Sequence, residues 1–365
     1  MARAPAVIEI EAPPEVDRLE GFPHPRETQT VFGHAASERA LVDAFAAGRM
    51  HHAWLLTGRT GIGKATLAFR LARFLLASPG ERKHPETSLD IDANSVAARQ
   101  VLALSHPGLL VLRRPWLTTT KRFATTIPID EVRRLRGFLG HTAAEGTWRV
   151  VIVDTADDLN PNAANALLKS LEEPPTRTVF ILLASEPGRL LPTIRSRCRI
   201  LPLAPLRPDD LRRAASAAAG QEGSQNLPES MEALADGSVR RLLELSDGTG
   251  TKLHERIQAI LSALPKIDWG AAHALADDLG SPAADQRFET FFTVLLSVLA
   301  KAIRNAAAEQ GAVPAAWTIP SERAPVWADL WETIGREKEE AVELNLDRRA
   351  LILSTLSRLA AAAQA

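Results

Sequence analysis

Four runs of consecutive apolar residues mark the N-terminal half of the chain, at residues 54–56, 109–112, 150–153 and 179–183. The apolar residues in each run do not alternate with polar ones. Such strands are typical of a parallel sheet, because helices cover both of its faces and bury every side chain. Between the last two runs, Asn160 and Pro161 suit the N-cap and first turn of a helix. The pattern predicts an α/β domain with a parallel sheet over residues 26–203.

Helical periodicity replaces the strand-like runs after Pro202. Phe288, Phe291, Leu295 and Leu299 recur every three or four residues, which predicts one apolar helix face, and core packing is its simplest role. A stretch rich in Gly, Ser and Gln interrupts the preceding region at 220–225. We therefore expect a small helical domain over residues 204–251 and a second one over 252–365. Residues 1–25 are rich in Pro and Glu and predict a flexible N-terminal tail.

Composition narrows the class of protein. The 365 residues include 43 Lys and Arg against 44 Asp and Glu, for a net charge of −1, and 45% are hydrophobic. This balance excludes global disorder and gives no overall electrostatic attraction to nucleic acid or membranes, although local clusters such as Lys121-Arg122 remain. A single cysteine excludes a disulfide framework and a multi-cysteine zinc site. With no signal peptide or bilayer-length apolar run, we expect a cytoplasmic protein without a membrane partner.

A glycine-rich loop follows the first apolar run. Gly58, Gly61 and Gly63 precede Lys64, and helical spacing begins directly after the lysine. In a phosphate-binding loop, backbone N–H groups surround the phosphates, the helix N-terminus adds a positive dipole, and the lysine reaches the β- and γ-phosphates. The strand before the loop and the helix after it make a nucleotide-phosphate loop the favoured interpretation.

Two parts needed for hydrolysis are absent. The residue after the lysine normally supplies a hydroxyl to Mg²⁺, but here it is Ala65. Thr66 follows, yet one step along a helix turns a side chain by about 100°, so it should not replace that ligand. Asp154 ends a buried strand as a Mg²⁺-binding carboxylate would, but Thr155 stands where hydrolysing relatives have a glutamate base. Neither absence forbids nucleotide binding, since Lys64 and the loop amides are present, but together they predict that efficient hydrolysis is lost.

Several motifs resemble the clamp loader of bacterial DNA polymerase III, an AAA+ family. Residues 149–199 contain NALLKSLEEPP, ASEP and the block Ser196-Arg197-Cys198. The stretch HHAWLLTGRTGIGKATLA is similar to the family's phosphate-loop region, GSVR at 237–240 to its lid, and NLDRR at 345–349 to its C-terminal collar. The resemblance covers nearly the whole chain after residue 25 and is closest to the delta-prime type of subunit.

The resemblance implies an α/β P-loop AAA+ module with a parallel sheet, a small helical lid over 204–251 and an all-α collar for oligomerisation over 252–365. It implies that Arg197 acts in trans as an arginine finger on ATP bound by a neighbouring motor subunit. Ser185 matches the sensor residue that contacts the γ-phosphate, and Arg240 matches a phosphate-contacting arginine of the lid. The residues alone allow a turn-forming serine at 185 equally well, and with a defective site Arg240 has a domain–domain ion pair as its alternative.

The same resemblance implies motor (gamma/tau) and delta subunits as partners in a hetero-pentameric ring. It also implies that the subunit meets primer-template DNA and the sliding clamp only through the assembled complex. That complex is a DNA-directed DNA polymerase, and we expect this subunit to add no catalysis of its own. We expect no required cofactor and no zinc, since the family's four-cysteine module is absent, and bound but unhydrolysed ATP stays open. The alternative is an active AAA+ ATPase motor subunit of gamma/tau type, against which Ala65 and Thr155 argue. A small-molecule phosphotransferase would leave the helical half and the Ser-Arg-Cys block unexplained.

Overall fold

The computed structural model describes residues 14–140, 147–223, 229–246, 248–281, 284–307 and 317–364. The chain divides into two compact units, Met1–Leu206 and Arg207–Ala365. This division lies close to the predicted end of the α/β domain at residue 203. The further boundary expected between residues 251 and 252 falls inside a continuous helix, α10 (Gly248–Ala263), so a division there would have to cut that helix.

The first unit is built on a five-stranded parallel sheet. Its strands are β1 (Ala53–Thr57), β2 (Leu109–Leu112), β5 (Arg149–Val153), β6 (Thr178–Ala184) and β7 (Arg199–Pro202), in the order β2-β5-β6-β1-β7. Leu55 pairs with Leu182 on one side and with Ile200 on the other. All four predicted strands are present, and the parallel α/β class is confirmed.

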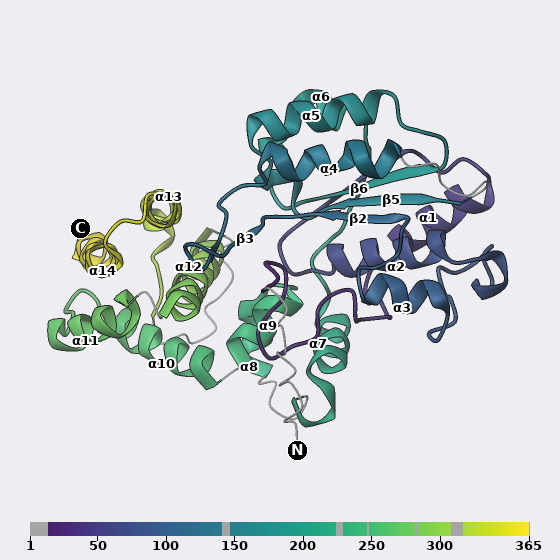
Figure 1. Ribbon diagram of the computed structural model, residues 1–365. Helices are drawn as coiled ribbons and strands as arrows, with labels where there is room; N and C mark the ends of the chain where they lie inside the picture. Colours follow the sequence, from purple (N-terminus) through teal and green to yellow (C-terminus); the bar gives the residue numbers. More distant parts are fainter. Residues whose placement is uncertain are drawn as a thin grey trace, which may run out of the picture. The chain divides into compact units, whose positions relative to one another are not determined.

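Helices cover both faces of this sheet, which explains why the strands are apolar throughout (Figure 1). On one face lie α1 (Ala35–Ala46), α2 (Lys64–Leu76) and α3 (Val96–Leu102); on the other lie α4 (Ile129–Gly140), α5 (Pro161–Glu172) and α6 (Pro192–Arg195). Leu56 and Ile181 point into the first core layer, and Leu55 and Leu182 into the second. Asn160 caps α5 as predicted, with its side-chain oxygen accepting the Ala163 N–H at 2.8 Å.

A short antiparallel hairpin and three single 3-10 turns complete the first unit. The hairpin pairs β3 (Trp116–Leu117) with β4 (Arg122–Phe123), and the rings of Trp116 and Phe123 meet edge to face at 5.0 Å between centroids. The turns lie at Pro79–Glu81, Ala156–Asp158 and Pro187–Arg189.

The N-terminal segment differs from the flexible tail predicted over residues 1–25. From residue 14 onward it is held by charged side chains, while the earlier residues lie outside the described part. Arg113 bonds Glu15 at 2.7 Å and Asp17 at 2.8 Å. The imidazole of His24, which is fully buried, lies 2.7 Å from Asp17. Composition predicted a solvated segment because it could not show that acidic residues in it meet an arginine some 100 positions later.

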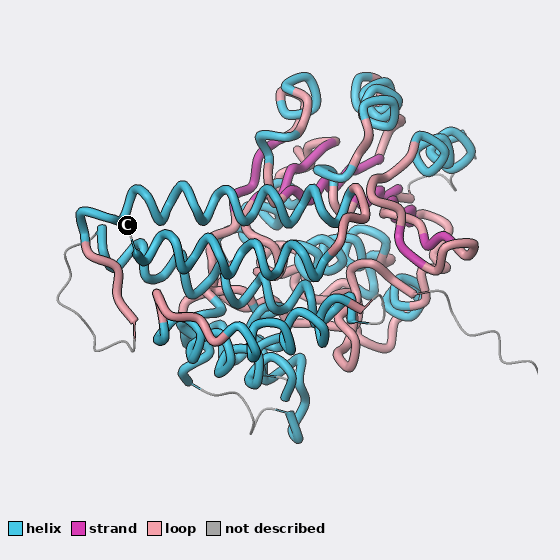
Figure 2. The backbone as a smooth tube through the Cα atoms, turned by 90° about the vertical axis from the view of Figure 1, so that its left-hand side faces the viewer, coloured by secondary structure: helices cyan, strands magenta, loops and turns pink. Residues whose placement is uncertain are grey.

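All the regular secondary structure described in the second unit is helical. It contains α7 (Pro208–Gly223), α8 (Glu229–Ala235), α9 (Val239–Ser246), α10, α11 (Trp269–Gly280), α12 (Asp285–Ala307), α13 (Ala324–Glu343) and α14 (Arg348–Gln364), with a 3-10 turn at Ser321–Arg323. The long helices α12, α13 and α14 lie side by side in succession (Figure 2). The helical region predicted after Pro202 is therefore confirmed.

Helix α12 owes its apolar character to the core of this unit. Its residues 287–307 are long enough to cross a membrane, and an 18-residue window within them has a mean hydropathy of 1.3. However, Phe288, Phe291 and Phe292 are at most 1% exposed, and the helix packs against α10 and α13. The predicted apolar face is thus a packing face, as the helical spacing indicated.

Candidate functional site

The loop between β1 and α2 curves through three glycines with left-handed backbone angles. The φ angles are 136° at Gly58, 77° at Gly61 and 107° at Gly63. A side chain at Gly58 would place its Cβ 2.4 Å from the Leu203 carbonyl oxygen and 2.7 Å from the Ile62 Cδ1 atom. Only glycine fits at this position, because any side chain would collide with the backbone just after β7 and with the side chain of Ile62 in the loop.

Lys64 fills the centre of this loop. Its ammonium group donates to the carbonyl oxygens of Gly58 (2.6 Å) and Arg59 (2.7 Å) and to the Ser185 hydroxyl (3.0 Å). An ammonium group has three protons, so these acceptors satisfy it completely. Burial lowers the pKa of Lys64 to about 8, although the nearby carboxylates of Asp154 and Asp157 act in the opposite direction.

Ala65 and Thr66 both lie in the first turn of helix α2, but their side chains lie in different surroundings. The Ala65 methyl group packs against the core layer of α1 and α2 and offers no oxygen beside the loop. Thr66 lies one position further along the same helix and is half-buried. The structure therefore has a complete phosphate loop without the hydroxyl that normally binds Mg²⁺.

Asp154 lies at the carboxyl end of β5, next to the loop. Its side chain is buried, and within the described residues its Oδ2 atom has no hydrogen-bond partner. Burial raises the pKa of Asp154 to about 7; the charge of Asp17 adds to this effect, while Lys64 and Arg113 oppose it. An unpartnered buried carboxylate oxygen suits a cation, but with Ala65 and Thr155 in place the residues do not fit a hydrolytic magnesium site.

Substituting Asp154 by Asn should stabilise the chain at neutral pH. The pKa of Asp154 is about 7 in the folded state and near the ordinary aspartate value of 3.8 in the unfolded state, so folding stability falls as pH rises across that window. Asparagine mimics the protonated form, and we expect Asp154→Asn to gain about 1–4 kcal/mol at pH 8. Urea unfolding at pH 4, 6 and 8 measures this gain. A difference that did not grow between pH 4 and 7 would contradict the assignment.

Ser185, at the end of β6, joins the loop as predicted. Its hydroxyl accepts from Lys64 and, at 3.1 Å, from Thr60. Its backbone N–H and that of Glu186 donate to Asp157 Oδ2, at 2.6 and 3.0 Å. Sequence reasoning missed Asp157, although its position three residues after Asp154 was a signal. This carboxylate anchors the turn that carries Ser185, so the β5 and β6 ends act as one support for Lys64.

Arg197 lies on the turn that connects α6 to β7. Its NH1 group donates to the Thr193 carbonyl oxygen at 3.0 Å, and its NH2 group lies 2.7 Å from the Glu172 carboxylate. The Arg197 side chain is 36% exposed, so it is within reach of another molecule. The neighbouring Cys198 packs into the core, and burial raises the pKa of its thiol to about 12, which makes it unreactive.

Comparisons with known proteins agree with this arrangement. A family model described as "DNA polymerase III, delta subunit" matches residues 33–207. The chain is 32% identical over 260 residues to DNA polymerase III subunit delta′ of Escherichia coli, covering 71% of this chain and 73% of that one. The chain belongs to the DNA polymerase III delta′ family. The subunit delta′ of Pseudomonas aeruginosa is 42% identical over 147 residues, but this match covers only 40% of this chain and 41% of the relative.

The delta′ family also resembles other subunits of the same polymerase. The tau subunit of Salmonella typhimurium is 28% identical over 248 residues, which is 66% of this chain and 36% of the relative. Among solved structures, a gamma-subunit-related protein of Thermotoga maritima is 18% identical with a TM-score of 0.46, and the match covers 89% of this chain and 99% of that one.

The remaining predicted residue of this delta′ chain belongs to the second unit. Arg240 lies on α9, where its Nε group donates to Glu244 at 2.8 Å. This ion pair lies within one helix, whereas the alternative to a phosphate contact was a domain–domain ion pair, and a role toward phosphate stays a prediction. As for metals, no group of three or more His, Cys, Asp or Glu side chains suited to an ion occurs in the part of the chain that the structure describes.

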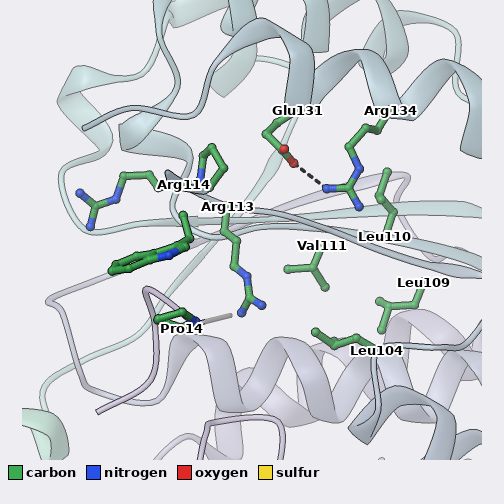
Figure 3. Close-up of a pocket in the computed structure, with 11 residues that line it drawn as sticks. Pro14, Leu104, Leu109, Leu110, Val111, Arg113, Arg114, Glu131 and Arg134 are labelled. Carbon is green, nitrogen blue, oxygen red and sulfur yellow. Dashed lines mark hydrogen bonds and ion pairs between the residues drawn. The ribbon is translucent and has the colours of Figure 1, made fainter. Parts of the chain in front are cut away.

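A cavity of about 310 Å³ lies beside the edge strand β2, apart from the predicted site residues (Figure 3). Leu109 and Val111 of β2 line it, together with Arg113 and Arg134. Each arginine is paired within the chain, Arg113 with Glu15 and Arg134 with Glu131. No sequence pattern predicted this cavity, because its walls come from segments that lie far apart in the chain.

Proposed function

We propose that the chain is a non-hydrolysing stator subunit of the DNA polymerase III clamp-loader complex. In this role it assists ATP-driven loading of the sliding clamp onto primed DNA. Its partners are motor (gamma/tau) and delta subunits in a hetero-pentameric cytoplasmic ring, and primer-template DNA is met through the complex. Membership of the delta′ family supports the choice of complex.

The methyl group of Ala65 carries the non-hydrolysing part of the proposal. A motor subunit needs a hydroxyl on Mg²⁺ and a base for the attacking water, and Ala65 and Thr155 provide neither. The three protons of the Lys64 ammonium group already have acceptors within the chain. A phosphate would have to displace one of them, which favours the loop without bound nucleotide. Nucleotide held in this loop would remain intact.

The second part of the proposal is that Arg197 completes the ATP site of a neighbouring subunit. An arginine finger places a guanidinium group on the γ-phosphate and stabilises the charge that develops during transfer. Arg197 stands on a rigid turn with a partly exposed guanidinium group, which is what such a role requires. The competing candidate, an active motor subunit, is not favoured, because no observation supplies the two absent catalytic groups.

The purified chain should show no ATP turnover above background. Its rate is expected to be at least about 100-fold below that of a purified motor subunit, because the general base is absent. A phosphate-release assay with and without primed DNA measures this, with the motor subunit as positive control. Turnover comparable to the motor subunit would overturn the stator role.

A further inference from the structure

Arg197 is held by its own chain at both terminal nitrogens. NH1 donates to the Thr193 carbonyl oxygen at 3.0 Å, and NH2 bonds the Glu172 carboxylate at 2.7 Å. These two groups form the fork with which an arginine grips a phosphate. Turning both of these N–H groups to a nucleotide therefore means exchanging the Glu172 carboxylate and the Thr193 carbonyl oxygen for phosphate oxygens.

The backbone beneath Arg197 is fixed, so this exchange depends on the side chain. The Arg197 N–H donates to the Ile194 carbonyl oxygen at 3.1 Å, and the Cys198 N–H donates to that of Arg195 at 3.2 Å. The Cys198 side chain packs against the core layer of α4 and α5. The turn is thus anchored on both sides of the arginine, and the long side chain is the part that can move.

Glu172 is well placed to act as the competing anion. It is the last residue of α5, where the negative end of the helix dipole disfavours a carboxylate, and Arg197 supplies the compensating positive charge. Its side chain is 48% exposed, so the pair stands in water and is weak. A triphosphate carries several negative charges and can accept from both terminal nitrogens, so it outcompetes a single exposed carboxylate.

We propose that Glu172 is a latch that holds Arg197 against its own subunit until a neighbour presents a nucleotide phosphate. Glu172 is a positioning residue, acting only through Arg197, and this inference rests on the proposed finger role. The latch keeps the neighbouring ATP site incomplete at rest and is released by the charge of the correctly placed nucleotide.

The variant Glu172→Gln tests the latch because it keeps the shape of the side chain and removes its charge. In the isolated chain, the rate at which phenylglyoxal modifies Arg197, followed by peptide mass mapping, should rise about 2- to 5-fold at low salt. In the reconstituted complex, ATP turnover without DNA should rise by a similar factor. Both increases should shrink at 0.5 M salt, because ions screen an exposed pair.

Glu173→Gln is the matched control, since it removes the adjacent exposed charge from the same helix end. It should change neither rate, and both variants should unfold at the wild-type urea midpoint. Unchanged labelling of Arg197 in Glu172→Gln would overturn the latch, and so would faster labelling with unchanged or slower turnover. An Arg197→Ala complex with wild-type turnover would instead remove the finger role itself, and the latch with it.

Discussion

Replacing Arg197 by alanine should slow ATP hydrolysis at the neighbouring motor site by on the order of 10³-fold, while the ring still assembles. An arginine finger in trans contributes about 10³ to 10⁵ to the rate of phosphoryl transfer, because it stabilises charge that appears only in the transition state. Arg197 lies on the surface turn before β7 and makes one exposed ion pair, so its loss should cost the fold little. Turnover is measured in a complex whose other ATP sites are inactivated, so that the rate reports only on the motor site next to Arg197.

Two variants separate this role from general loss of charge. Arg197→Lys keeps a positive charge but lacks the planar fork, and should recover only a small part of the rate. Arg195→Ala removes the arginine at the end of α6, two residues before Arg197, and should leave turnover near the wild-type value. Native mass measurement confirms that each ring contains all its subunits. Wild-type turnover in an intact Arg197→Ala ring would refute the finger role.

Gly58→Ala should destabilise the first unit by about 2–5 kcal/mol. The new Cβ would lie 2.4 Å from the Leu203 carbonyl oxygen, and the φ angle of 136° is one that residues other than glycine rarely adopt. Overpacking and backbone strain each cost about 1–3 kcal/mol in such cases. Relief would require β7 to shift, because Leu203 donates its N–H to Thr57 at the end of β1. Urea unfolding of the purified chain measures the loss.

Gly137→Ala provides a control with the opposite sign. Gly137 lies inside α4, and an added Cβ there meets nothing within 4 Å. Alanine should therefore stabilise the helix by about 0.5–1 kcal/mol. If Gly58→Ala changed stability as little as Gly137→Ala does, the close approach of the loop to Leu203 would be wrong.

The sequence by itself determined those elements of the fold that depend only on residues close together in the chain. Continuous apolar runs predicted the buried parallel strands, because a strand covered on both faces has no polar side to show. The phosphate loop could be predicted for the same reason: the spacing of Gly58, Gly63 and Lys64 encodes its shape locally. Ala65 and Thr155 are likewise visible in the sequence, since each stands directly beside the residue that defines its motif.

Only the tertiary structure decided which distant charges meet. The pairing of Arg197 with Glu172, of Asp157 with the Ser185 turn, and of the N-terminal segment with Arg113 follows no sequence period. These contacts form because the parallel sheet brings the ends of distant strands together, with β1 inserted between β6 and β7 out of chain order. Charged side chains interact strongly only within a few ångströms, so the order of the strands determines these partners.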